Sequence, residues 1–343
     1  MAKRKQRNIP ATVPQIIDRI VELYKRRVSW HKAQKSLILQ AKAICRRLCD
    51  NNKDAADLLY AKIEKMPSDH LLTIAMEAEA FDEGNNGESE ESLLYDAIIE
   101  TRPIMISIAT HETYRTDVEK ELAVLAQHLP IAKFVEEVNG FSWLSLAALI
   151  GSCGDFYRYS TVYKLWKRMG LAVMSDGRQR KMADAQKAKE HGYAPPRRSE
   201  AWKIGTSVLR AQTARMGKDE DGKKTEEVAR EAGPWRLVYD ARKAYEAEKN
   251  ENGDYADQAA RRLREANFGE NTEAFKAYSR GRLSKAHLHA RAQRYMEKRL
   301  IKALYLEWKK VMPLPEELAK FQINREPHPD QVAAERREAE AAA

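Results

Sequence analysis

Glycine and proline are scarce in this chain, which has 15 glycines and 12 prolines among its 343 residues. Few segments alternate β-branched and polar residues, so the sequence predicts little or no sheet. It contains no run of about 18 apolar residues, and we therefore expect no membrane-spanning helix. The basic amino-terminal segment lacks an apolar core, so no secretion signal is expected. The three cysteines, Cys45, Cys49 and Cys153, lack the spacing of a disulfide framework and are expected to be reduced thiols in a cytoplasm.

Motifs of common catalytic sites are also missing. The sequence has neither a Walker motif nor a dinucleotide-binding motif. His287 and His289 could bind a metal, but no third ligand stands at a supporting spacing, so a structural or phosphate-contact role is the favoured interpretation. Cys45 and Cys49 share one helix face and are expected in the interior. We predict no cofactor and no metal site.

Positive charge is concentrated in two parts of the chain, whose formal net charge is +9. Residues 1–50 hold 13 Lys and Arg against three acids, and residues 156–210 hold 13 against four. An acidic patch at residues 82–91 lies between them. Such segregation indicates contact with a polyanion, because each neutralised phosphate releases counterions. The alternative is that these charges only cover solvent-exposed helix faces and bind no polyanion.

Apolar residues recur at helical spacing through most of the chain. Long helices are predicted at Pro14–Cys49 and at Ser92–Gln127, the second bent or interrupted near Pro103. They could pair as a hairpin or coiled coil. A basic loop with some helix is expected at Asp176–Arg198, and a polar linker at Gly217–Glu227. Further helices are predicted at Ala55–Met66, Asp69–Ala80, Trp202–Met216, Pro234–Lys249, Tyr255–Asn267 and Ser284–Val311.

The segment Val135–Leu171 predicts a helix, a tight turn, an apolar helix and then a basic aromatic helix. Gly140 can end the first helix in the left-handed conformation, and Ser142 can cap the second. This is a helix-hairpin-helix layout, whose turn leaves N–H groups free for a phosphate. The alternative is an ordinary helical hairpin that packs into a core. In the third helix, Tyr and Trp side chains alternate with Lys and Arg. We expect some of the rings to pack in the core and the cations to lie along a nucleic-acid backbone.

The same segment resembles the carboxy-terminal domain of insertion-sequence transposases grouped as the 110/116/902 family. There a G-[IF]-[GS] turn precedes an apolar helix, a GD pair and a closing GL pair. Here these are Gly140-Phe141-Ser142, Gly154-Asp155 and Gly170-Leu171. Three further blocks follow in the family's order, at Trp202–Gln212, Gly233–Tyr245 and His289–Lys309. The resemblance covers roughly Leu122 to Lys310.

The resemblance also implies what this chain lacks. Full-length members carry a ribonuclease H-type domain, in which four carboxylates on a sheet hold two metal ions. Residues 1–120 predict helix instead, so we expect that nuclease domain to be missing. Members also carry a nucleophilic serine in S-K-x-G-N-x-x-L-R, where this chain has Trp202 at the serine position and Lys203 at the lysine.

Ser199 is the candidate nucleophile, because a shift of three residues in the alignment puts this serine at the motif's serine position. It stands there next to Arg197 and Arg198, which could lower its pKa or hold a phosphate. A helix N-cap is the favoured alternative for Ser199. Ser284 also precedes a lysine, as the serine of the motif does, but it lies after the block Gly233–Tyr245. The predicted DNA-binding residues are Gly140, Phe141, Ser142, Trp143, Arg158, Lys164, Lys167, Arg168, Arg197, Arg198, Lys203 and Arg210.

We therefore expect an all-α protein, with a long helical hairpin or coiled-coil region followed by a helix-hairpin-helix-like and helical transposase-type domain. The expected parts are a basic tail (1–13), a helical region (14–128) with the acidic linker 82–91, a DNA-binding unit (129–175), a transposase carboxy-terminal-like region (176–312) and a charged tail (313–343).

The expected function is that of a DNA-binding protein resembling these transposases, without nuclease activity of its own. Two alternatives stay open: a transposase or recombinase subunit with a serine nucleophile, and a non-enzymatic helical scaffold that binds RNA or protein. The expected partner is DNA, with a structured guide RNA implied by the resemblance alone. No membrane is expected, and the helical region could form a homo-oligomer. The expected location is the bacterial or phage cytoplasm, associated with the nucleoid.

Overall fold

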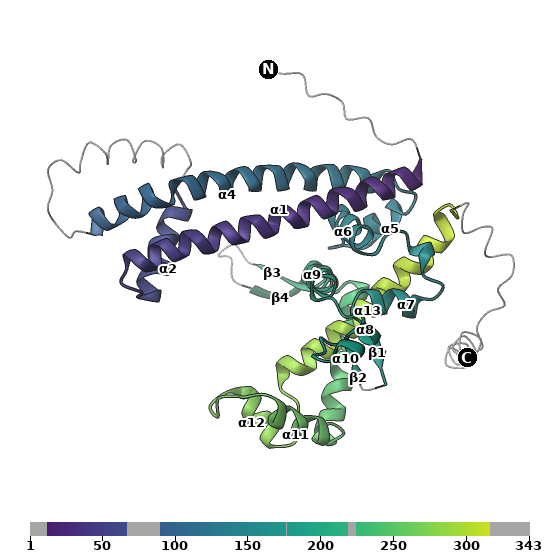
Figure 1. Ribbon diagram of the computed structural model, residues 1–343. Helices are drawn as coiled ribbons and strands as arrows, with labels where there is room; N and C mark the ends of the chain where they lie inside the picture. The colour runs from purple at the N-terminus through teal and green to yellow at the C-terminus, as the bar shows by residue number, and fades with distance from the viewer. Residues whose placement is uncertain (1–11, 67–89, 176, 219–223, 316–343) are drawn as a thin grey trace, which may run out of the picture. The chain divides into compact units, whose positions relative to one another are not determined.

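The computed structural model describes residues 12–66, 90–175, 177–218 and 224–315 (Figure 1). Helices dominate, and the strands form only two small antiparallel sheets, which confirms the all-α class. The predicted helix Asp69–Ala80, most of the acidic linker and most of both tails lie outside the described residues. The chain divides into two compact units: Asp18–Gln127, and a second made of Met1–Ile17 with His128–Ala343.

The first unit is a helical hairpin with a short helix at its connection. Its elements are α1 (Val13–Leu48), α2 (Lys53–Glu64) and α4 (Glu90–Gln127). Between α1 and α2, Asp50 and Asn51 take positive φ angles of 49° and 64°, which reverse the chain. Asn52 then caps α2 by accepting from the main-chain N–H groups of Asp54 and Ala55.

The long helices α1 and α4 run antiparallel and side by side (Figure 1). Arg19 pairs with Glu121 at 2.8 Å, and Arg27, further along α1, pairs with Glu119 at 2.7 Å. The ring of Trp30 meets that of Tyr114 edge-on, with centroids 4.4 Å apart. As α1 advances from Arg19 to Trp30, its contacts on α4 move back from Glu121 to Tyr114, as expected for two antiparallel helices.

The core of this unit surrounds the helical connection. Cys45 and Cys49 are both buried there with Leu59, Ile63 and Ile98. Their predicted interior position is therefore confirmed, and both thiols are free.

Of the predicted bend or interruption near Pro103, the interruption is wrong, because α4 continues through this residue as one helix. A proline removes one helical N–H and crowds the preceding turn. Ser107 Oγ donates a hydrogen bond of 2.9 Å to Pro103 O. Residues of α1 form ion pairs with α4 on both sides of the proline, Arg47 with Glu100 and Arg27 with Glu119.

The second unit begins with short helices and continues through two β-hairpins. The first elements are α5 (Ala132–Glu137), α6 (Trp143–Cys153), η1 (Phe156–Arg158), α7 (Val162–Arg168), β1 (Val173–Met174), β2 (Gly177–Arg178), α8 (Ala185–His191) and α9 (Pro195–Ala211). They are followed by β3 (Arg215–Lys218), β4 (Lys224–Arg230), α10 (Pro234–Glu251), α11 (Ala256–Glu265), α12 (Glu273–Ser279) and α13 (Lys285–Val311).

Helix α13 is the central element of the second unit. It packs against α7, α9, α10 and η1. Leu300, Leu304 and Trp308 on it are almost completely buried. The Trp308 ring lies 4.5 Å from that of Phe156, and its Nε1 donates to Asp155 Oδ1 at 3.0 Å. Residues 285–311 thus form the central core helix of this unit.

Several short elements of this unit differ from the predictions. Part of the expected polar linker Gly217–Glu227 pairs as β3 and β4, with Lys218 opposite Lys224. The basic loop with some helix expected at Asp176–Arg198 contains the helix α8, as predicted, but also the strand β2, and α9 begins inside it because Pro195 occupies the first helical turn. Helix α9 also ends at Ala211 rather than at Met216, and α12 was not predicted. These elements are short and highly charged, so they carry little apolar periodicity.

Among the helices that the structure describes, none is both long and apolar enough to cross a membrane.

Candidate nucleic-acid interface

The predicted turn between two helices is present at Gly140. Gly140 has a φ of +90°, a conformation that favours glycine, and Phe141 N donates to Val138 O at 2.9 Å. Ser142 then caps α6 by accepting from Ser145 N at 3.2 Å. The local sequence thus forms the tight turn between α5 and α6 that the glycine and serine indicated.

The turn is packed on one side against the end of α9, within its own unit. A Cβ at Gly140 would lie 2.6 Å from Ala211 Cβ and 2.8 Å from Val208 Cα. Gln212 Nε2 donates to Asn139 O at 3.0 Å, which fixes the turn to the residue after α9. Of the predicted contact residues here, Phe141 is buried, Trp143 is half-buried and only Ser142 is exposed. This turn can therefore present little more than Ser142 and the start of α6 to a phosphate.

The basic helix α7 and the preceding η1 offer more accessible charge. Arg158, Lys164 and Arg168 are exposed, and Lys167 is half-buried. Some of the intervening rings pack inward, as expected: Trp166 Nε1 donates to Lys298 O at 3.1 Å, and Tyr159 hydroxyl donates to Cys153 O at 2.7 Å, whereas Tyr163 is exposed. Aromatic side chains thus anchor this segment to the core while its cations lie at the surface.

Ser199 lies inside α9, and the N-cap interpretation is wrong. The N-cap residue is Ala194, with proline at the first helical position. Ser199 is exposed, but both flanking arginines are engaged elsewhere. Arg197 Nε donates to Arg168 O at 2.8 Å, and Arg198 pairs with Glu297 at 2.8 Å. The two arginines that were expected to activate Ser199 therefore direct their donors to other groups.

The remaining candidates on α9 differ in accessibility. The side chains of Arg198 and Glu297 are 13% and 1% exposed, so this pair belongs to the interior. Lys203 is exposed and pairs with Glu200 at 3.2 Å, and Arg210 is exposed near the end of the helix. Lys203 and Arg210 thus stay accessible to a ligand, whereas Arg198 holds α9 against α13.

The two histidines that could have bound a metal have separate structural partners. Tyr278 hydroxyl lies 3.2 Å from His287 Nδ1, and Tyr239 hydroxyl lies 2.7 Å from His289 Nδ1. Burial, and then the positive charges of Arg291 and Arg178, lowers the pKa of His287 to about 4. No group of three or more potential metal ligands occurs within the described ranges.

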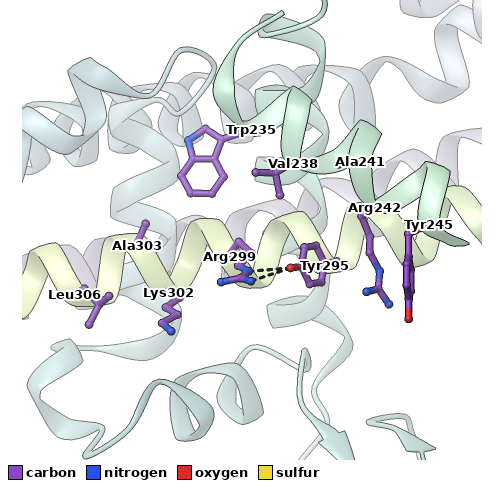
Figure 2. Close-up of a pocket in the computed structure, with 10 residues that line it drawn as sticks. All are labelled: Trp235, Val238, Ala241, Arg242, Tyr245, Tyr295, Arg299, Lys302, Ala303 and Leu306. Atoms are coloured by element: carbon purple, nitrogen blue, oxygen red, sulfur yellow. Dashed lines mark hydrogen bonds between the residues drawn. The ribbon is translucent and has the colours of Figure 1, made fainter. Parts of the chain in front are cut away.

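A groove between α10 and α13 combines aromatic and cationic side chains (Figure 2). Its cavity measures about 620 Å³ and has no carboxylate among its lining residues. The guanidinium of Arg242 lies 4.5 Å from the ring centre of Tyr245 and 4.8 Å from that of Tyr295. The lining residues are Trp235, Val238, Ala241, Arg242, Tyr245, Tyr295, Arg299, Lys302, Ala303 and Leu306.

Hydrogen bonds fix the cations of this groove in place. Arg299 donates to Tyr295 hydroxyl from Nε at 3.1 Å and from Nη2 at 2.9 Å (Figure 2). Arg242 donates from Nε to Glu246 at 2.9 Å. The sequence predicted both helices but not the groove, because the residues that line its two sides are about fifty positions apart in the chain.

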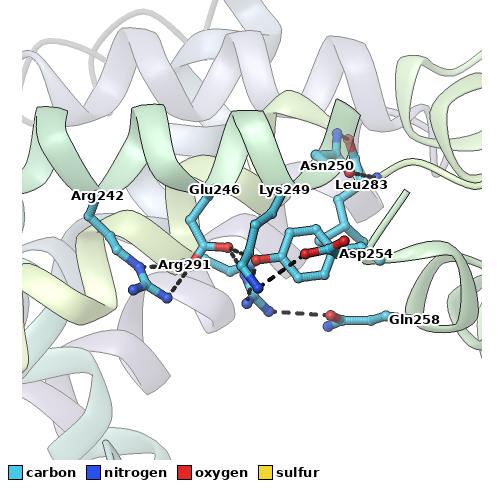
Figure 3. A network of polar contacts seen from close by, with 9 residues as sticks. Arg242, Glu246, Lys249, Asn250, Asp254, Gln258, Leu283 and Arg291 are labelled. Carbon is cyan, nitrogen blue, oxygen red and sulfur yellow. Dashed lines mark hydrogen bonds and ion pairs between the residues drawn. The ribbon is translucent and has the colours of Figure 1, made fainter. Parts of the chain in front are cut away.

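Behind the groove, Glu246 joins α10 to α13 through a buried network (Figure 3). The residue is 1% exposed and accepts from Arg291 Nε and from Tyr255 hydroxyl, each at 2.6 Å. Burial alone would raise the pKa of Glu246, but the hydrogen bonds from Tyr255 and Arg291 bring it below its usual value. The carboxylate therefore stays charged and holds Arg242 at the edge of the groove.

Comparisons with protein-family models, with curated proteins and with solved structures found no match for this chain.

Proposed function

We propose that this chain binds nucleic acid through the unit that contains His128–Ala343, and that the nucleic acid is DNA. The groove between α10 and α13 carries the proposal, because three aromatic and three cationic side chains line it and no carboxylate does; Glu246 pairs with Arg242 from behind the groove. Aromatic faces stack on bases, and neighbouring cations contact the sugar-phosphate backbone. This arrangement suits an unpaired or splayed stretch of a strand.

The surface of α7 supports the same proposal. Lys164 and Arg168 are exposed there, and the segment 156–210 carries a large excess of Lys and Arg. DNA is preferred over RNA on the sequence resemblance to transposases. The alternative with a serine nucleophile receives no support from the surroundings of Ser199, whose neighbouring arginines have other partners.

The proposal is tested by removing two cations from the groove. We compare Arg299→Ala/Lys302→Ala with the control Lys276→Ala/Arg280→Ala, which removes the same charge from exposed positions in and beside α12. Binding of the full chain to single-stranded and duplex DNA is measured by fluorescence anisotropy. The groove variant should bind single strands about tenfold more weakly than the control. Equal affinities of the two variants would refute the role of the groove.

A further inference from the structure

Two of the three aromatic rings in the groove between α10 and α13 already have cations beside them. Lys249 Nζ lies 5.5 Å from the ring centre of Tyr245, and Arg242 Cζ lies 4.5 Å from it. The ring centre of Tyr295 lies 4.8 Å from Arg242 Cζ and 5.3 Å from Arg299 Cζ. Cations and rings thus alternate through these five side chains, which we name the cation–ring ladder. A base that stacks on either tyrosine has to compete with these cations.

Carboxylates hold two of the three cations of the cation–ring ladder. Arg242 pairs with Glu246 at 2.6 Å, and Lys249 pairs with Asp254 at 3.1 Å (Figure 3). Arg299 differs from both, because it is exposed and has no carboxylate partner within the described part of the chain. Its hydrogen bonds go to the hydroxyl of the neighbouring tyrosine. Arg299 is therefore the cation of the ladder whose charge is left to bind a phosphate.

Trp235 is the aromatic residue of the groove that stands outside the cation–ring ladder. It is half-buried at the start of α10, ten residues before Tyr245 and thus about 15 Å away along the helix. Figure 2 shows its indole pointing toward α13, between Ala303 and Arg299. Within the described residues, no cation lies over this indole. Of the rings that line the groove, Trp235 is therefore the one left open to a base.

We propose that the groove binds one unstacked nucleotide at a time, with its base on Trp235 and its phosphate at Arg299. This inference rests on the proposed function and specifies its ligand as a single nucleotide that stands out of the stack. The cavity of about 620 Å³ has the size of a small-molecule site. Every base has a π-face, so stacking on an indole tolerates any of the four. A duplex with one unpaired nucleotide then supplies the whole ligand.

Four DNAs test this inference with the full chain by fluorescence anisotropy. They are a paired duplex, the same duplex with one bulged nucleotide, the bulged duplex with an abasic residue in the bulge, and a single strand. The abasic bulge keeps the sugar, the phosphate and the flexibility of the bulge and removes only the base. Wild type should bind the bulged nucleotide about tenfold more tightly than the abasic bulge, because the abasic residue cannot stack.

Variants then locate the stacking ring. Trp235→Leu keeps an apolar side chain but removes the aromatic face, so it should bind the two bulged duplexes equally. The control is Trp202→Leu, which should keep the tenfold difference, because Trp202 is 51% exposed on α9 and does not line the groove. Arg299→Ala should weaken binding of both bulged duplexes by the same factor, since both retain the phosphate. Where Trp235→Leu does not fold, the comparison of the two bulges with wild type is decisive by itself.

The outcomes separate this inference from the proposed function. Equal affinity of wild type for the two bulged duplexes would overturn the inference. The proposed function would stand without it if the single strand still bound more tightly than the paired duplex. A preference for the base that persists in Trp235→Leu would also overturn the inference, because the base would then stack elsewhere. No binding to any of the four DNAs would refute the proposed function itself.

Discussion

The backbone of Gly205 on α9 lies directly against the side chain of Glu297 on α13. A Cβ at position 205 would stand 2.6 Å from Glu297 Cγ and 2.9 Å from its Oε1. Glu297 cannot move away easily, because it is buried, pairs with Arg198 and accepts from Gln293 Nε2 at 3.0 Å. The glycine in the block Trp202–Gln212 is therefore explained by packing between α9 and α13.

Gly205→Ala should destabilise the second unit. Alanine favours a helix over glycine by about 1 kcal/mol, but the clash with a buried side chain outweighs this gain. We expect a net loss of about 2 kcal/mol in the free energy of unfolding, measured by urea denaturation. The control is Gly269→Ala, whose Cβ would meet only Thr272 Cγ2 at 3.7 Å. Equal stability of the two variants would contradict this account.

Stability should fall in mild acid because of His287. Its folded-state pKa of about 4 lies below the usual value of 6.5, so the folded state favours the neutral ring. The contribution of this residue is present above about pH 6.5 and is lost as the pH falls toward about 4. His287→Gln should lose less stability over this interval than wild type, as measured by urea denaturation at a series of pH values. An identical pH profile for His287→Gln and for the exposed control His128→Gln would exclude the effect.

The cations of α7 should contribute to DNA affinity without regard to sequence. Lys164, Lys167 and Arg168 become alanine in one variant, and affinity is measured over a range of salt concentrations. If all three contact phosphate, the slope of log affinity against log salt should shrink by about 0.9 per lost contact. Circular dichroism checks that the variant is folded. An unchanged slope in a folded variant would count against a phosphate role for α7.

The purified chain should bind DNA without cutting it or forming a covalent adduct, with or without magnesium. The arginines that flank Ser199 have other partners, and the described residues contain no cluster of metal ligands. Denaturing gels of a labelled suicide substrate provide the measurement. A covalent adduct that disappears in Ser199→Ala would overturn this expectation. An adduct lost instead in Ser284→Ala would need a stability control, because Ser284 caps α13 through His287 N.

Long helices could be predicted from the sequence to within a few residues. The apolar stripes of α1, α10 and α13 extend over many turns, so their period dominates the local signal. Gly140 likewise identified its turn, because few residues tolerate a φ of +90°. The short β3–β4 hairpin was not predicted, because its strands are rich in charged residues and lack an alternating apolar pattern. Each of the two strands pairs only with the other.

The candidate site was harder to predict, because one-dimensional patterns do not reveal which cations are buried. Arg198 was expected at a DNA surface, but its side chain pairs with Glu297 from a helix about one hundred residues later. The groove cation Arg299 was not singled out, although it lies in a block that the resemblance included. Side chains acquire these roles only when α9, α10 and α13 pack together.

The salt dependence of DNA binding by the full chain tests the central claim most directly. Affinity for a duplex and for each of its single strands is measured by fluorescence anisotropy between about 50 and 300 mM sodium chloride. Binding that uses at least three phosphate contacts should weaken with a log–log slope of about −2 or steeper. We predict such a slope and tighter binding to a single strand than to the duplex. Absence of binding at the lowest salt, or an affinity independent of salt, would contradict the account.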